Sequence, residues 1–317
     1  MRIGGEARDA GVPKRPRLPN FLIVGAAKSG TTTLASHLSK HPDVYVPPAK
    51  ELYFFERDEL WDKGPDWYAE QFASAGDAIA VGEATPGYMF YPWSVERIAQ
   101  LLPGVRAIVC LRDPVERAYS HYLHWADRMW FEPRSFGEAV EDELAAGADE
   151  VAAHDPRRSP PYFAYLARGK YLEQLERLAG ALGRDSVHVL LLEDLQADPG
   201  GTFSAICSFL GVDPGVTVPN LGARENVYSP HTPRRAWRWL TKHRVLQRLP
   251  RPVAKLIARR IVAPRPRPVP PMDPAVQGRL AEHFVPYNAA LADWLGRDLS
   301  GWTAPPRGAG AALAGQG

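Results

Sequence analysis

Short apolar runs alternate with longer stretches of helical spacing along most of this chain. Four runs are typical of buried strands: 21–24, 78–81, 106–111 and 187–192. The third is apolar from Ala107 to Leu111 without alternation, as in a strand covered on both faces. Strands that alternate with helices in this way predict an α/β fold with a central, mostly parallel sheet flanked by helices.

Helical spacing appears in seven stretches: 30–40, 94–101, 115–128, 135–146, 162–182, 201–210 and 274–294. The helix expected at 115–128 has a clear start. Asp113 is placed to cap it, and Pro114 takes the first helical position, where a missing N–H costs nothing.

The first strand leads into a turn of small residues, 25–33, with one lysine and several hydroxyls. Backbone N–H groups of such a turn, followed by a helix N-terminus, predict a phosphate site. Nucleotide-triphosphate loops carry their lysine directly after the second glycine. Here Lys28 precedes Gly30, so the turn has the chemistry of phosphate binding without the spacing of a kinase or ATPase.

Two further strand ends carry unusual residues. Glu83 follows the second strand, and Arg112 follows the third, with Ser120 about two helical turns later. Open α/β sheets bind their ligands at the carboxyl ends of the strands. Together the carboxyl ends of the three strands therefore predict a phosphate-binding turn, a carboxylate and a second anion-binding site.

Composition narrows the class of protein. The 317 residues are 45% hydrophobic and 23% charged, enough for a sizeable core. A net charge of +2 gives no reason to expect nucleic acid as a partner. The two cysteines, Cys110 and Cys207, exclude a disulfide framework and a cysteine-rich metal site. Since no apolar stretch approaches about 18 residues, a soluble, cytoplasmic protein is expected.

The chain is predicted to contain a flexible basic arm at 1–18, a single domain at 19–302 and a disordered tail at 303–317. Within the domain, 226–272 has many arginines and lysines and no acidic residue. This basic segment predicts amphipathic helices that face an anionic ligand, lie on an acidic membrane surface, or present a solvated basic face.

In six segments, which occur in the same order as the motifs of the family, the chain resembles the superfamily of sulfotransferases that use 3′-phosphoadenosine 5′-phosphosulfate (PAPS). Within that superfamily it most resembles the heparan sulfate sulfotransferase type. The matching segments are 28–32 (K-x-G-T-T), 41–44 (H-P-D-V), 50–55 (K-E-x-x-F-F), 83–88 (E-x-T-P-x-Y), 111–122 (L-R-D-P-x-x-R-x-x-S-x-Y) and 295–302. The resemblance implies a P-loop-containing nucleotide-binding fold over the predicted domain.

The resemblance also implies cofactor contacts. Lys28 would lie beside the oxygen that bridges phosphate and sulfuryl group and stabilise the leaving phosphate, and Arg112 with Ser120 would hold the 3′-phosphate. The full set implied to bind PAPS, or its product adenosine 3′,5′-bisphosphate, is Lys28, Ser29, Gly30, Thr31, Thr32, Thr33, Arg112, Ser120, Arg234 and Arg235. No metal is required by this logic, because a sulfuryl group carries less charge than a phosphoryl group.

Glu83 resembles the general base of the family, which takes the proton from the acceptor. The alternative is a structural carboxylate paired with an arginine, and His121 or His124 would then be the fallback base. The residues implied to lie near the acceptor are Lys50, Glu51, Tyr88 and Tyr171.

The expected acceptor is a hydroxyl, less readily an amine, of a carbohydrate, glycolipid or natural product. Ala84 stands where glycosaminoglycan enzymes usually have lysine, and a composition rich in alanine, arginine and proline suggests a bacterial source. Two alternatives remain open. One is a small-molecule P-loop kinase that uses ATP and Mg²⁺ with Asp113 as metal partner, and the other is a membrane adaptor acting through the basic segment.

Overall fold

The computed structural model describes residues 17–49, 51–126, 132, 134–153, 164–222 and 269–302, with the backbone alone at 147–153. These residues belong to two compact units. The first draws on Met1–Ala26, Gly30–Leu111 and Glu176–Ala223, and the second on Ala27–Ser29, Arg112–Leu175 and Arg224–Gly317.

Three sequence predictions lie wholly or mainly outside the described residues: the arm at 1–18, the basic segment 226–272 and the tail at 303–317. The single domain over 19–302 stays a prediction. Within the described part of the chain, no helix is long and apolar enough to cross a membrane.

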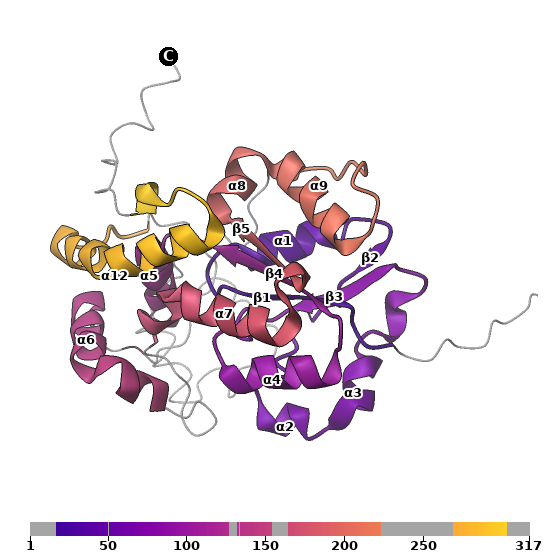
Figure 1. Ribbon diagram of the computed structural model, residues 1–317, viewed down its shortest axis with the longest axis horizontal. Helices are drawn as coiled ribbons and strands as arrows, with labels where there is room; N and C mark the ends of the chain where they lie inside the picture. The colour runs from indigo at the N-terminus through magenta and orange to yellow at the C-terminus, as the bar shows by residue number, and fades with distance from the viewer. Residues whose placement is uncertain are drawn as a thin grey trace, which may run out of the picture. The chain divides into compact units, whose positions relative to one another are not determined.

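A five-stranded parallel sheet forms the centre of the first unit (Figure 1). Its strands, in the order β2-β3-β1-β4-β5, are Val44–Tyr45, Ala80–Ala84, Phe21–Gly25, Arg106–Leu111 and Val187–Leu191. The first strand lies in the middle, and later strands are added on both of its sides. The carboxyl end of β1 is therefore the topological switch point, where such sheets bind ligands.

One face of this sheet is covered by α1 (Thr31–Leu38), α8 (Leu192–Ala197) and α9 (Pro199–Leu210) (Figure 1). Ala80 and Ala84 of β3 pack into the core on this side, together with residues of all three helices. Because successive side chains of a strand point to opposite faces, Glu83 points to the other face.

The face that receives Glu83 is covered by aromatic side chains and by α2 (Asp58–Trp61), α3 (Gly64–Glu70) and α4 (Pro92–Leu101). Phe54 is fully buried and stacks on Tyr68 of α3, with ring centroids 4.3 Å apart. Phe55 lies edge-on to both Tyr68 and Tyr88. This aromatic layer, rather than an aliphatic one, surrounds the carboxyl of Glu83.

The second unit is helical in its described part. It contains α5 (Pro114–His124), α6 (Phe136–Ala153), α12 (Pro274–Leu295), the 3₁₀ turns η3 (Ala167–Gly169) and η6 (Ser300–Trp302), and the start of α7 (Tyr171–Leu182). Its core joins Val115 and Ala118 of α5 to Phe136 of α6 and to Leu280 and Phe284 of α12. Asp113 accepts hydrogen bonds from the N–H groups of Val115 and Glu116, so the predicted helix cap is confirmed.

Two predicted elements have different bounds. The strand expected at 78–81 is β3, Ala80–Ala84, because its ladder with β1 continues through Gly82 and Glu83 although the apolar run has ended. The helix expected at 162–182 begins only at Tyr171. In its place, the carboxylate of Glu143 accepts the N–H groups of Tyr165, Leu166 and Ala167 and so holds that backbone in a turn.

The remaining differences concern ends and short elements. The helix expected at 115–128 ends at His124, and the one expected at 135–146 continues to Ala153. The structure also contains the short elements β2, α2, α3 and α8, which the apolar pattern does not predict because each has too few residues to show a period.

Candidate active site

The turn after β1 has an unusual backbone. Lys28 has φ +73° and Gly30 has φ +87°, both in the left-handed region. A non-glycine residue there is strained, and such strain is found mostly at functional sites. Left-handed residues within a turn also direct neighbouring N–H groups to one side, which makes a concave site for an anion.

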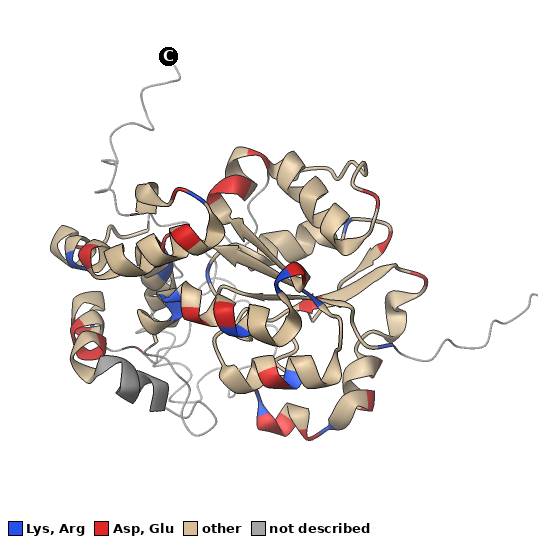
Figure 2. Ribbon diagram, in the orientation of Figure 1, with Lys and Arg blue, Asp and Glu red and all other residues tan. Residues whose placement is uncertain are grey.

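The N-terminus of α1, which follows this turn, is free of carboxylates. Its N-cap is Gly30, without a side-chain hydrogen bond, and its first turn has no acidic residue. In contrast, α2 and α8 carry acidic pairs in their first turns, Asp58 with Glu59 and Glu193 with Asp194 (Figure 2). Since a helix N-terminus attracts negative charge, α1 is left available for an anionic ligand.

Ser29 adds a hydroxyl to the same turn. Its side chain is fully buried and lies within hydrogen-bonding reach of the hydroxyl of Tyr171. A hydroxyl and backbone N–H groups on one turn are donors suited to a phosphate group such as that of PAPS.

In the second unit, Arg112 contacts the backbone of the turn, and Tyr171 in turn contacts the backbone of Arg112. Arg112 Nη1 lies 3.4 Å from the carbonyl oxygen of Lys28, and the buried Tyr171 hydroxyl donates to the carbonyl of Arg112 at 2.8 Å. The guanidinium of Arg112 also forms an ion pair with Glu116 at 2.6 Å. The structure therefore brings together Lys28, Arg112 and Tyr171, while Ser120 lies half-buried on α5.

The two histidines weighed as fallback bases have other contacts. The Nζ of Lys28 lies 3.4 Å from Nδ1 of His124. His121 is buried, and its Nε2 accepts a hydrogen bond from the indole of Trp125 at 2.7 Å. Burial and the nearby cation of Arg117 lower the pKa of His121 well below its usual value, so its ring stays neutral.

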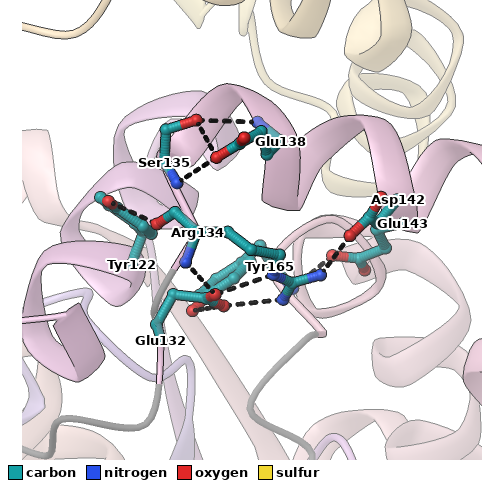
Figure 3. Close-up of polar contacts among 8 residues, drawn as sticks. All are labelled: Tyr122, Glu132, Arg134, Ser135, Glu138, Asp142, Glu143 and Tyr165. Carbon is teal, nitrogen blue, oxygen red and sulfur yellow. Dashed lines mark hydrogen bonds and ion pairs between the residues drawn. The ribbon is translucent and has the colours of Figure 1, made fainter.

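Arg117 of α5 carries a charge but does not lie on the helix surface. It is fully buried and donates to the carbonyl of Tyr165, and burial lowers its pKa to about 10. It holds the turn before α7 in place. The same turn is fixed by Glu143, near a cluster in which Arg134 pairs with Glu132 and Asp142 (Figure 3).

Glu83, the predicted general base, is completely buried near the carboxyl end of β3. Its Oε1 accepts from the hydroxyl of Tyr88 at 2.6 Å and from that of Tyr68 at 3.3 Å. Its Oε2 accepts from the hydroxyl of Thr85 at 2.7 Å. In the described part of the chain, the side chains that contact this carboxylate carry hydroxyls and none is an arginine, so the structural ion pair considered as an alternative is not formed there.

Burial raises the pKa of Glu83 from 4.5 to about 7, although its hydrogen bonds act in the opposite direction. The largest of these opposing effects comes from Tyr88, followed by Thr85, Tyr68 and the backbone N–H of Leu52. A carboxyl with a pKa near neutrality is suited to proton transfer at physiological pH.

The other predicted contact residues have mixed positions. Glu51 accepts a hydrogen bond from the hydroxyl of Tyr53, and Tyr88 is buried against Glu83. Thr31 is buried at the start of α1, whereas Thr32 and Thr33 are half-buried. Lys50, Arg234 and Arg235 lie outside the described residues.

Two contacts could not be read from the sequence. Tyr68 contacts Glu83 from α3, a helix too short to predict, and no motif includes it. The contact between Lys28 and His124 joins residues 96 positions apart. The contact of Thr85 with Glu83 could have been predicted from the sequence. Both residues belong to one motif, and a hydroxyl two residues further along the chain can contact a carboxylate.

Comparison with known proteins identifies the class. The family model described as "Sulfotransferase domain" matches residues 18–222, more than half of the chain. The chain therefore belongs to this family, whose members use PAPS as the sulfuryl donor. This confirms the family and the P-loop-containing fold expected from the sequence, and the kinase alternative is not supported.

The chain is similar to three sulfotransferases described below. A solved sulfotransferase from Alicyclobacillus acidocaldarius is 30% identical with a TM-score of 0.65, over 91% of this chain and all of that one. The membrane-associated sulfotransferase kil1 of Dictyostelium discoideum is 37% identical over 146 residues, which cover 44% of this chain. The bifunctional heparan sulfate N-deacetylase/N-sulfotransferase 3 of Homo sapiens is 29% identical over 208 residues, 62% of this chain. The matched regions span only 31% and 23% of these two curated relatives.

Proposed function

We propose that this chain transfers the sulfuryl group of PAPS to a hydroxyl of a carbohydrate, glycolipid or natural-product acceptor. The observation that carries the proposal is the Glu83 carboxyl, buried near the carboxyl end of β3 with its pKa raised to about 7. A base of this kind is ionised in a useful fraction of molecules at neutral pH and still binds a proton well.

Each residue of the proposed site has one task. The ionised Glu83 takes the proton of the acceptor hydroxyl as its oxygen attacks sulfur and the bond from sulfur to the phosphate oxygen breaks. The ammonium of Lys28 stabilises the negative charge that develops on the departing phosphate oxygen. The planar fork of Arg112, with the hydroxyl of Ser120, holds the 3′-phosphate and so fixes the donor in line.

Glu83→Gln tests the assignment of the base. The amide has nearly the same volume but cannot accept the acceptor's proton, so we expect transfer to fall by at least about a hundredfold, in line with the usual contribution of general-base catalysis. Binding of adenosine 3′,5′-bisphosphate, measured by calorimetry, should stay within about twofold. Loss of that binding would give Glu83 a structural role, and full activity would exclude it as the base. Glu138→Gln is the matched control, because Glu138 is exposed on α6, and this variant should keep activity.

The acceptor is tested with radiolabelled PAPS and the full chain. The panel contains neutral oligosaccharides, amino sugars, glycolipids and phenols, each incubated without added metal and separated by chromatography. Label on a hydroxyl of a sugar or natural product supports the proposal, and label only on amines would move the acceptor to the N-sulfated class. No transfer to any member, with adenosine 3′,5′-bisphosphate still bound, would contradict it.

A further inference from the structure

The carboxyl of Glu83 is held by more donors than burial alone requires. Two hydroxyls contact it at 2.6 and 2.7 Å, from Tyr88 and Thr85. These distances lie within the usual range for O–H donors, whereas the 3.3 Å contact of Tyr68 lies beyond it. Leu52 adds a backbone N–H. The carboxylate can accept about four hydrogen bonds, and the long contact of Tyr68 leaves part of this capacity for another donor.

The donors are themselves fixed. The ring of Tyr68 stacks on Phe54 with an angle of 6° between their planes, and Phe72 lies edge-on at 5.2 Å. The ring of Tyr88 lies edge-on to Phe55 at 5.3 Å. Rings packed on several sides cannot rotate freely, so their hydroxyls stay aimed at the carboxyl.

The segment before the aromatic pair is connected to the same cluster. The backbone N–H of Tyr53 donates to Oγ1 of Thr85 at 3.2 Å, and the Thr85 hydroxyl in turn donates to Glu83. Residues 52–55 therefore contribute one N–H group to the carboxyl, one N–H group to Thr85, and the two rings that pack on Tyr68 and Tyr88. This gives the K-E-x-x-F-F segment a task that its sequence does not suggest.

We propose that Tyr88 and Thr85, with a smaller contribution from Tyr68, are positioning residues that hold the Glu83 carboxylate in one orientation and set the pH at which it loses its proton. Among the described residues, the groups that face the carboxyl are Tyr68 of α3, Thr85 and Tyr88 after β3, and the N–H of Leu52, and none of the four is charged. The effect of these residues on sulfuryl transfer rests on the proposed function, whereas their effect on the protonation of Glu83 does not.

The direction of the effect follows from the donors. Each hydrogen bond stabilises the ionised form, so loss of one raises the pKa of Glu83 further. A short hydrogen bond to a charged group corresponds to a shift of about one to two pH units. With a midpoint near 7, a rise of about one unit lowers the ionised fraction at pH 7 by about fivefold.

Infrared difference spectroscopy of the full chain measures this without an acceptor. The C=O stretch of protonated Glu83 is the carboxyl band that Glu83→Gln removes, and it is followed from pH 5 to 9. We expect the midpoint to rise by about one to two units in Tyr88→Phe and by under about half a unit in Tyr68→Phe. Tyr165→Phe is the matched control, because it removes a buried tyrosine hydroxyl from another carboxylate, Glu132, at 3.1 Å (Figure 3). It should leave the Glu83 band unchanged.

An unchanged midpoint in Tyr88→Phe overturns the inference. If that variant does not give a cooperative melt, Thr85→Val replaces it, since valine keeps the shape and removes the hydroxyl; it should raise the midpoint by a similar amount. Kinetics separate the two proposals. If transfer depends on Glu83, the acidic limb of kcat in Tyr88→Phe should move by the same amount and recover at high pH. Unaltered transfer in Glu83→Gln would exclude the proposed base while leaving the infrared result valid.

Discussion

Burial of Glu83 should make the protein lose stability, relative to a variant without the carboxyl, as the pH rises through neutrality. The perturbation is Glu83→Gln. The native pKa of about 7 exceeds the ordinary value of 4.5, so the native state binds the proton more tightly than the unfolded state does. The stability that Glu83 contributes is therefore complete below pH 4.5 and is lost as the pH rises through 7.

The magnitude follows from the same two values. Each unit of pKa difference corresponds to about 1.36 kcal/mol. Between pH 5 and pH 8, wild type should lose roughly 2.5 kcal/mol of unfolding free energy relative to Glu83→Gln. Any fixed effect of the amide on packing cancels, because only the change with pH is compared.

Urea denaturation at pH 5 and pH 8 measures both proteins. Between pH 5 and pH 8, the difference in unfolding free energy between the two proteins should shift by roughly 2.5 kcal/mol in favour of the variant. Glu138→Gln serves as the control, because Glu138 is exposed and its pKa is lowered, so it is ionised in both states across this range. A difference between wild type and Glu83→Gln that does not change with pH would refute the argument from burial.

Two other predictions concern the cofactor and the core. Glu116→Gln releases Arg112 from an ion pair worth about 0.3–0.5 kcal/mol, so the affinity for adenosine 3′,5′-bisphosphate in calorimetry should rise about twofold; a weaker affinity would contradict competition between the two anions. Gly169→Ala would place a Cβ 2.8 Å from the ring of Phe284 and should cost about 1–3 kcal/mol in urea denaturation. Gly180→Ala lies in α7, where the new Cβ meets no atom of the described residues within 4 Å apart from its chain neighbours and the nearby backbone of its own helix, and should instead gain about 0.5–1 kcal/mol. Equal effects of the two changes would argue against the packing described.

The parts of the fold that could be predicted are the strands whose burial on both faces requires a run of apolar residues. β1 and β4 are covered on both faces, so their sequences are continuous apolar runs. β3 is different, because its last residues include Glu83, whose charge interrupts the run while the ladder with Leu22 continues. The end of that strand was therefore missed, although the carboxylate at its carboxyl end was found.

The site could be predicted only where it is local in sequence. Lys28 and Gly30 stand in one turn, and the strain at Lys28 is consistent with the phosphate-binding turn expected there. Contacts that depend on packing between distant segments were not accessible. Tyr68 reaches Glu83 because α3 stacks on Phe54, and Glu143 replaces helical hydrogen bonds from a different helix. Neither contact produces a periodic pattern in the sequence from which it could be predicted.

The central claim is that the turn at Lys28 and the arginine at Arg112 bind PAPS rather than a nucleoside triphosphate with metal. Thermal unfolding of the full chain in EDTA, with adenosine 3′,5′-bisphosphate at about 100 times its dissociation constant, should show a stabilisation of about 2.7 kcal/mol. ATP at the same concentration, with Mg²⁺ and without EDTA, should give much less. Equal stabilisation by the two ligands, or stabilisation by ATP with Mg²⁺ alone, would contradict the account.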